Sequence, residues 1–285
     1  MIGSIIGDIV GSIYEFDNIK TKDFPLFQSR QEYTDDSILT LATADWLMNG
    51  GTSGSYYLRY ALENPYPMGS YGTGFIQWVH LASRGIMKPY YSCGNGSAMR
   101  VGPVGWACTS KEEVLQKAKE SAECTHNHPE GIKGAQATAL CIFMARRGDN
   151  KKTIRDAISH EFGYNLGMSV NEIRDRYSWS GLDGAGDGGT CQGSVPQAIV
   201  CALEANSLED AIRNAVSIGG DSDTIACIAG SIAEALYGMP QAIRNQALSY
   251  LPEKFKVLMN RFEERFGILC IRLLILNYKR KLYNE

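Results

Sequence analysis

Two clusters of acidic residues carry the strongest chemical signal in this sequence. They comprise Thr34, Asp35 and Asp36 in the first cluster, and Asp221, Asp223 and Thr224 in the second. Carboxylate and hydroxyl oxygens are the ligands that hard divalent cations prefer. If the fold brings the clusters together, their aspartates can balance the charge of two Mg²⁺-like ions. Without cations the same carboxylates repel one another and favour protonation. The residue types therefore predict a dinuclear metal site.

Each cluster also stands where a helix is expected to begin, which offers a simpler interpretation. Apolar runs follow the clusters, at residues 38–48 and 225–237. Aspartate, serine and threonine are favoured at helix N-termini, and acids in the first turn suit the helix dipole. Capping is the preferred interpretation of either cluster taken alone. Asp221 and Asp223 indicate a further role, because a cap needs only one such side chain and the preceding Gly219-Gly220 lets the backbone approach a ligand closely.

A glycine loop at residues 94–100, with the sequence GNGSAMR, could bind phosphate. Its glycines expose backbone N–H groups, Ser97 offers a hydroxyl and Arg100 could supply charge. The loop lacks the lysine and the spacing of a nucleotide P-loop, and it lacks the strand context of a dinucleotide-binding fingerprint. An ordinary glycine turn is the preferred interpretation of this segment on its own.

Two further side chains are candidates for chemistry. His126 lies in the segment CTHNHP at residues 124–129. A zinc site there would need more ligands at suitable spacing, and a Cys–His pair on a loop need not converge. A hydrogen-bond donor to a polar ligand is slightly favoured over a simple loop histidine. Glu15 follows the first predicted helix, and it is either a solvated helix end or a carboxylate that positions or deprotonates water at the metal site.

The composition is that of an ordinary globular protein. The chain has 285 residues, of which 44% are hydrophobic and 21% charged, with a net charge of −3. The sequence contains no long basic patch of the kind that binds nucleic acid, so nucleic acid is not an obvious partner. The 8 cysteines occur singly, which predicts free thiols in a reducing cytoplasm. No signal peptide is evident, and the apolar residues 268–276 are fewer than the roughly 20 that a bilayer span needs.

Most of the elements that must position these residues show helical periodicity in the sequence. Alternating apolar runs are scarce, so the fold is predicted to be mainly α. Gly3, Gly7 and Gly11 form a stripe of small residues that predicts tight helix packing in a soluble core. Residues 49–74, 89–105 and 178–194 are predicted to interrupt the helices. A site shared by both acidic clusters requires one domain that closes over the two ends of the chain.

Together these motifs resemble those of ADP-ribosylglycohydrolases, the relatives of the glycohydrolase that reactivates dinitrogenase reductase. The resemblance covers about residues 1–265. It rests, in chain order, on residues 7–15 (GDIVGSIYE), 33–37 (YTDDS), 94–100 (GNGSAMR), 125–126 (TH) and 219–224 (GGDSDT). The resemblance implies an all-α, single compact multi-helix domain. It also implies a cleft holding two divalent cations, with Mg²⁺ favoured and Mn²⁺ as the alternative.

The resemblance also implies roles for individual residues. The cations would be held by Thr34, Asp35, Asp36, Asp221, Asp223 and Thr224. Glu15 would act near the scissile bond and His126 would contact the ligand. The diphosphate and the adjacent ribose would be held by Gly94, Asn95, Gly96, Ser97 and Met99. The sequence departs from the family in the glycine-rich residues 181–189 and in a C-terminal tail at residues 266–285, and no role is carried over to either segment.

The expected activity is hydrolysis of the glycosidic bond between ADP-ribose and an acceptor, with a modified protein side chain favoured over a small molecule. The alternatives are a non-catalytic ADP-ribose-binding module, a structural protein of the same fold and a dinuclear nucleotide phosphohydrolase. The presence of every metal ligand and of Glu15 favours the enzyme over the first two. The sequence leaves the acceptor and the oligomeric state open, and acceptor specificity is expected in residues 49–74 and 178–194.

Overall fold

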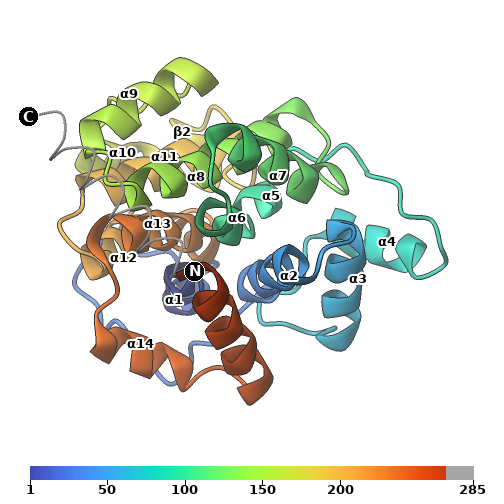
Figure 1. Ribbon diagram of the computed structural model, residues 1–285. Coiled ribbons are helices and arrows are strands. Elements are labelled where there is room, and N and C mark those ends of the chain that lie inside the picture. The colour runs from blue at the N-terminus through green and yellow to red at the C-terminus, as the bar shows by residue number, and fades with distance from the viewer. Residues whose placement is uncertain (268–285) are drawn as a thin grey trace, which may run out of the picture.

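Helices account for most of the computed structural model, which describes residues 1–267 (Figure 1). The labelled helices are α1 (Ile2–Gly11), α2 (Asp35–Asn49), α3 (Ser53–Glu63), α4 (Thr73–Ala82), α5 (Gly96–Met99), α6 (Gly102–Ala107), α7 (Lys111–Glu123), α8 (Pro129–Arg146), α9 (Lys151–Phe162), α10 (Val170–Arg176), α11 (Cys191–Glu204), α12 (Leu208–Ser217), α13 (Ser222–Tyr237) and α14 (Gln241–Leu248). A 3₁₀ turn, η1 (Ser12–Tyr14), extends α1, and residues 253–267 are also helical. The predicted all-α fold is confirmed.

Within residues 1–267, the β-structure that forms a sheet is one short hairpin. Strands β1 (Tyr177–Ser178) and β2 (Gly181–Leu182) pair antiparallel, with Tyr177 opposite Leu182. The hairpin lies within the predicted interruption at residues 178–194, and the glycine-rich chain after it leads into α11.

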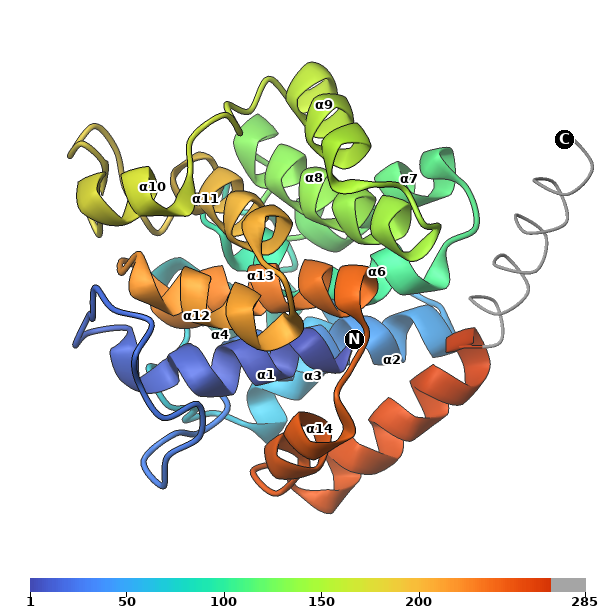
Figure 2. The same cartoon turned by 90° about the vertical axis from the view of Figure 1, so that its left-hand side faces the viewer.

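The helices stack in layers around the pair formed by α1 and α13. Figure 2 shows α12 and α13 in a middle layer, with α8, α9 and α11 on one side and α1, α2 and α14 on the other. Helix α13 packs against α1, α8, α11 and α12, so it forms the centre of the core. Its residues from Ser222 to Ala233 are all buried. One domain therefore contains both ends of the described chain.

The glycine stripe on α1 determines how closely α1 and α13 approach. A Cβ atom added to Gly3, Gly7 or Gly11 would overlap the α13 backbone at Gly230, Ala226 or Asp223 respectively. The predicted tight packing is thus confirmed. The contacts run in opposite directions along the two helices, so the pair is antiparallel. Consequently the C-terminal end of α1 meets the N-terminal end of α13, which brings Glu15 close to Asp223 and Asp221.

All three predicted interruptions of the helices are wrong in part. Residues 49–74 contain α3, residues 89–105 contain α5 and most of α6, and residues 178–194 include the start of α11. Composition suggested a loop in the first case because glycine, serine and tyrosine dominate it. Burial of Tyr57 and Tyr60 on one face of α3 outweighs those weak local preferences. The predicted tail lies outside the described residues from position 268 onward.

The structure also bears on the predictions for cysteines and for the membrane. The cysteines within residues 1–267 are free, and Cys93 and Cys124 are the two that are not fully buried. None of the helices in this part of the chain combines the length and apolarity that a bilayer crossing requires.

The close contact between α1 and α13 can be tested with Gly7→Ala. The added methyl group would collide with the backbone of Ala226, so we expect the free energy of unfolding to fall by about 3 kcal/mol. Urea denaturation measures this change. Gly186→Ala is the matched control, because a Cβ at Gly186 meets no atom within 4 Å. Equal stability of the two variants would contradict the proposed packing constraint.

Candidate active site

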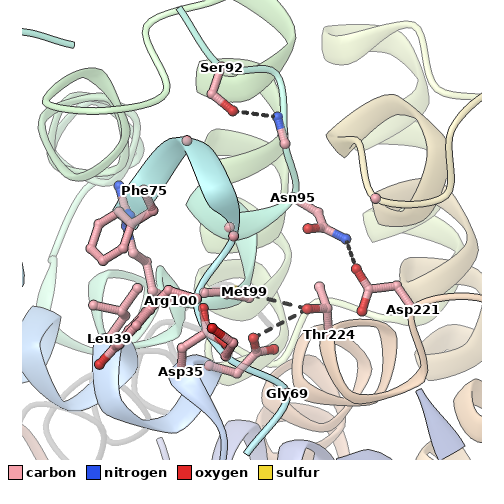
Figure 3. Close-up of a pocket in the computed structure, with 18 of the residues that line it drawn as sticks. Asp35, Leu39, Gly69, Phe75, Ser92, Asn95, Met99, Arg100, Asp221 and Thr224 are labelled. Carbon is pink, nitrogen blue, oxygen red and sulfur yellow. Dashed lines mark hydrogen bonds between the residues drawn. The ribbon is translucent and has the colours of Figure 1, made fainter. Parts of the chain in front are cut away.

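A cavity of about 350 Å³ opens where α1, α2 and α13 meet the glycine loop (Figure 3). Its lining contains most of the residues predicted to act, although they are widely separated in the sequence. They are Glu15, Asp35, Asp36, Gly94, Asn95, Gly96, Met99, His126, Asp221, Asp223 and Thr224. Residues 69–75, which comprise the end of the α3–α4 connection and the first turn of α4, form a further wall. Thr34 and Ser97 are buried and do not line the cavity.

The two acidic clusters converge on the floor of this cavity. Carboxylate oxygens of Glu15, Asp221 and Asp223 lie within 4.8 Å of one another. The Thr224 hydroxyl, from the second cluster, donates to Asp36 Oδ1 of the first cluster at 3.2 Å (Figure 3). The other oxygen of Asp36, Oδ2, is buried without a hydrogen-bond partner. Acidic side chains from both ends of the chain therefore face a common space.

Capping does not account for the acidic residues. At the start of α2, the side chain of Thr34 is the cap and accepts a hydrogen bond from the Asp36 N–H at 3.1 Å. The carboxylates of Asp35 and Asp36 take no part in this cap. At the start of α13, Asp221 occupies the N-cap position without a side-chain cap hydrogen bond. Its Oδ2 accepts instead from Asn95 Nδ2 at 2.8 Å.

Burial and mutual repulsion disfavour the charged forms of these carboxylates. Burial raises the pKa of Asp35, Asp36 and Asp223 well above its usual range, and the charges of neighbouring acids raise it further. The pKa of Glu15 rises to about 8, mainly through burial, with added repulsion from Asp221 and Asp8. Divalent cations would relieve both effects. The oxygen donors and the unpartnered Asp36 Oδ2 therefore fit hard divalent cations.

Asp8 supports the first acidic cluster from behind, a role that the sequence analysis missed. It is fully buried, and it accepts hydrogen bonds from the backbone N–H groups of Thr34 and Ser37 at 2.9 and 3.1 Å. The hydroxyls of the same two residues also donate to it. Asp8 thereby fixes the turn into α2 and the directions of Asp35 and Asp36. An acid on the glycine-lined helix is a signal that could have revealed it.

The glycine loop connects directly to the acidic floor. Asn95 donates through its backbone to Gly189 O at 3.0 Å and through its side chain to Asp221. The Ser97 hydroxyl donates to Gly131 O at 2.7 Å, so it stabilises the loop from behind. Met99 lies under the loop, with its sulfur 3.9 Å from the Thr224 hydroxyl. A ligand that contacts the loop would thus also lie beside the carboxylates.

His126 lies against the glycine loop, with its ring directed at Gly94 and Gly96. Its Nε2 lies 3.5 Å and 3.2 Å from the positions that Cβ atoms at Gly94 and Gly96 would occupy. Its Nδ1 lies 2.8 Å from the Thr125 hydroxyl. Burial, reinforced by the Arg100 charge, lowers the pKa of His126 well below its usual range, so the ring is neutral at physiological pH.

Arg100 determines which nitrogen of His126 carries the proton. Arg100 Nη2 donates to the Thr125 hydroxyl at 2.8 Å and to Ser121 O at 2.9 Å, and the guanidinium lies 4.0 Å from the centre of the Tyr57 ring. The Thr125 oxygen accepts from Arg100, and its own hydrogen has two acceptors, His126 Nδ1 at 2.8 Å and Ala122 O at 3.5 Å. We infer that it donates over the shorter distance to His126 Nδ1, which places the proton of His126 on Nε2, the nitrogen that faces the loop. Arg100 also lines the cavity, and its Nε and Nη1 are buried without a hydrogen-bond partner among the described residues, so its predicted role as a charge in the phosphate cradle stays a prediction.

The glycine-rich segment after α10 borders the cavity. Gly189 lines it, and Gly94 forms an isolated antiparallel bridge with Thr190. In the hairpin turn, Trp179 Nε1 donates to the backbone oxygen of Glu15 at 2.9 Å. The hairpin turn therefore touches the backbone of the candidate acid, and the departing residues 181–189 touch the glycine loop through Gly189 O.

The raised pKa values predict how cations stabilise the protein at different pH. An acid with a higher pKa in the folded chain holds more protons when folded, so stability falls as pH rises from its unfolded pKa to its folded pKa. This window extends to about 6 for Asp8 and about 8 for Glu15. Cations compete with those protons. We expect Mg²⁺ or Mn²⁺ to raise Tm by about 3 °C more near pH 8 than near pH 5.5.

Differential scanning fluorimetry measures this difference between the two pH values. Asp223→Asn removes one candidate cation ligand and should abolish most of the effect. Asp17→Asn is the control, because Asp17 is exposed. A cation effect that is independent of pH, or that Asp223→Asn leaves intact, would contradict the assignment.

The Arg100–Thr125–His126 arrangement predicts a defined tautomer. Thr125→Val removes the donor to Nδ1 at nearly constant volume, so we expect ¹⁵N NMR of the His126 ring to show a mixture of neutral tautomers. Thr125→Ser keeps the hydroxyl and should retain a single Nε2–H form. An unchanged spectrum in Thr125→Val would show that the hydroxyl does not select the tautomer.

The chain is similar to several known proteins. The chain is 27% identical to "ADP-ribosylhydrolase ARH3" of Mus musculus, over 93% of this chain and 87% of that protein. It is 28% identical to "ADP-ribosylhydrolase ARH3" of Homo sapiens, over 85% of each chain. It is 24% identical to "ADP-ribosylarginine hydrolase Tri1" of Pseudomonas putida, over 84% of this chain and 70% of that protein.

A solved structure described as an "ADP-ribosylglycohydrolase-related protein complex" superposes with a TM-score of 0.60. It covers 96% of this chain and 94% of its own, at 23% identity, and so supports the fold. The family model for ADP-ribosylglycohydrolases matches residues 1–277 of the sequence. With nearly the whole chain matched and both acidic clusters meeting in one cavity, this protein belongs to the ADP-ribosylglycohydrolase family of hydrolases.

Proposed function

We propose that this enzyme hydrolyses the glycosidic bond that joins ADP-ribose to a protein side chain, with two divalent cations, Mg²⁺ or Mn²⁺, in its active site. The observation that carries the proposal is the position of Glu15. Its carboxylate lies within 4.8 Å of those of Asp221 and Asp223, on the floor of a cavity whose wall is the glycine loop. An acid, a cation-binding floor and a candidate phosphate loop thus share one space.

The residues suited to hold the cations are Asp35, Asp36, Asp221, Asp223 and Thr224. When bound, the cations would supply positive charge that polarises ribose hydroxyls and water. Thr34 acts mainly through Asp36, because its hydroxyl accepts from the Asp36 N–H and donates to Asp8 at 2.7 Å. Four aspartates and a hydroxyl suit Mg²⁺ or Mn²⁺ better than zinc, which favours histidine and cysteine.

The chain's own residues bind and orient ADP-ribose. The backbone N–H groups of Gly94, Asn95, Ala98 and Met99 already donate within the protein, so those of Gly96 and Ser97 are the ones in this loop suited to the diphosphate. The His126 Nε2–H points at the same loop and donates a hydrogen bond without adding charge. Asn95 connects the loop to Asp221, so a diphosphate on the loop places the adjoining ribose over the carboxylates. This arrangement keeps the reacting carbon close to Glu15.

Glu15 handles the proton in the reaction. Its half-buried carboxyl lies within 4.8 Å of the carboxylates of Asp221 and Asp223, beside the expected position of the leaving atom, as a general acid requires. The bond between the ribose anomeric carbon and the acceptor breaks, its electron pair goes to the acceptor atom, and that atom takes the proton from Glu15. A water oxygen forms the new bond to the anomeric carbon and returns a proton to Glu15. The transition state has oxocarbenium character.

The partners that follow from this proposal are ADP-ribosylated proteins or small ADP-ribosyl conjugates. We expect no stable binding of nucleic acid, because the chain has a net charge of −3 and no long basic patch. The free cysteines of the described residues suit a reducing compartment such as the cytoplasm.

The proposal is tested by product analysis with Glu15→Gln and Asp223→Asn. With Mn²⁺ and a panel of ADP-ribosylated acceptors, we expect the wild type to release free ADP-ribose. Both variants should lose about a thousandfold in kcat. Mn²⁺ binding, followed by electron paramagnetic resonance, should persist in Glu15→Gln and weaken in Asp223→Asn.

Other outcomes would identify a different activity. Release of inorganic phosphate would indicate a nucleotide phosphohydrolase. Tight binding of ADP-ribose without turnover of any acceptor would indicate a binding module.

A further inference from the structure

Phe16 and Trp179 form an exposed aromatic shelf beside Glu15 and Gly189, two residues that line the cavity. Phe16 directly follows Glu15 and is 76% exposed, and Trp179 in the β1–β2 turn is 36% exposed. Their rings stack with centroids 6.2 Å apart and planes 6° from parallel. Contiguous exposed apolar surface marks binding sites, whereas single exposed apolar residues need no explanation.

The hairpin holds Trp179 in a defined place. The indole Nε1 donates to Glu15 O, and the backbone oxygen of Trp179 accepts from Gly188 N at 2.9 Å. The ring also passes within 3.9 Å of the position of a Cβ on Gly189, which lines the cavity. The shelf therefore reaches from Glu15 to Gly189, and its position is built by the glycine-rich segment.

The shelf lies on the path of the acceptor. A general acid must come within hydrogen-bond reach of the atom that it protonates, so the leaving atom of the acceptor lies beside the Glu15 carboxyl. The diphosphate is assigned to the glycine loop, and the acceptor is attached at the other end of the ribose. The groups bonded to the leaving atom consequently come within reach of Phe16 and Trp179.

The charges around the shelf favour a cation. The exposed Asp17 follows Phe16, and the exposed Asp187 accepts from Gly189 N at 2.9 Å. The nearby cations are already engaged. Lys20 Nζ donates to three backbone oxygens, those of Arg174, Tyr177 and Ile218, and Arg176 forms a bidentate pair with Asp183.

We propose that the Phe16–Trp179 shelf binds the planar cationic group of the acceptor, so that the preferred substrate is ADP-ribosylated arginine. A guanidinium is flat, weakly hydrated and well suited to stack on an aromatic face, whereas a serine acceptor offers no planar group. The inference rests on the proposed function, because it concerns the acceptor half of the same substrate. Phe16 and Trp179 act in specificity and take no part in proton transfer.

The experiment compares ADP-ribosylarginine with ADP-ribosylserine as small substrates in the presence of Mn²⁺. The wild type should have the higher kcat/KM for ADP-ribosylarginine. Phe16→Leu keeps an apolar side chain without an aromatic face, so it should raise KM for ADP-ribosylarginine about tenfold and leave kcat within about twofold. KM for ADP-ribosylserine and the Kd for free ADP-ribose should stay unchanged.

Two further variants separate stacking from structural effects. Trp179→Phe keeps an aromatic face but loses the hydrogen bond to Glu15 O, so KM for ADP-ribosylarginine should change less than in Trp179→Leu. Tyr66→Leu alters an aromatic residue that is 94% exposed and outside the cavity lining, and it should change neither substrate's kinetics.

The outcomes distinguish failure of this inference from failure of the proposed function. A wild type that prefers ADP-ribosylserine, or a Phe16→Leu variant that weakens both substrates equally, would overturn the shelf as an arginine site while leaving the hydrolase intact. Free ADP-ribose that binds while no acceptor is cleaved would overturn the proposed function itself.

Discussion

The close antiparallel contact between α1 and α13 is the constraint on which the site depends. Gly3, Gly7 and Gly11 let the α1 backbone rest on the backbone of α13, with no side chain between them. Any larger residue on this stripe would push the helices apart. The end of α1 would then move away from the start of α13, and Glu15 would lose its place beside Asp221 and Asp223. The position of Glu15 relative to the two aspartates thus depends on the absence of side chains at these three glycines.

Burying several carboxylates together opposes folding unless something compensates for their charge. The chain itself compensates for the charge of one of them, Asp8. Asp8 is satisfied within the protein by the N–H and hydroxyl groups of Thr34 and Ser37, so it can hold the turn into α2 without a cation. Asp35, Asp36 and Asp223 lack such a set of donors, and burial raises their pKa values strongly. This difference separates a supporting acid from acids suited to cations.

The sequence predicts the parts of this arrangement that depend on local pattern. Helical periodicity, the glycine stripe and the two acidic clusters are all legible in short windows, and together with the resemblance they indicated the fold and the family. Features that depend on tertiary contact were not predictable in the same way. Helix α3 forms because Tyr57 and Tyr60 are buried, although its composition resembles a loop. The turning of Arg100 toward Thr125 is decided by partners 21 and 25 residues further along the chain.

Acceptor specificity can differ within one fold because the ADP-ribose half and the acceptor half of the substrate are met by different parts of the chain. The residues assigned to ADP-ribose lie on or beside helices α1, α2, α5 and α13, which are held by the central core. The shelf depends instead on a hairpin whose two strands have two residues each. Trp179, in the turn of this hairpin, donates a hydrogen bond to Glu15 O. Changes in that hairpin would alter the surface met by the acceptor while the carboxylates and the glycine loop keep their positions. Recognition of the acceptor can therefore vary at little cost to the chemistry, because the hairpin and the glycine-rich residues after it meet the site through the backbones of Glu15 and the glycine loop.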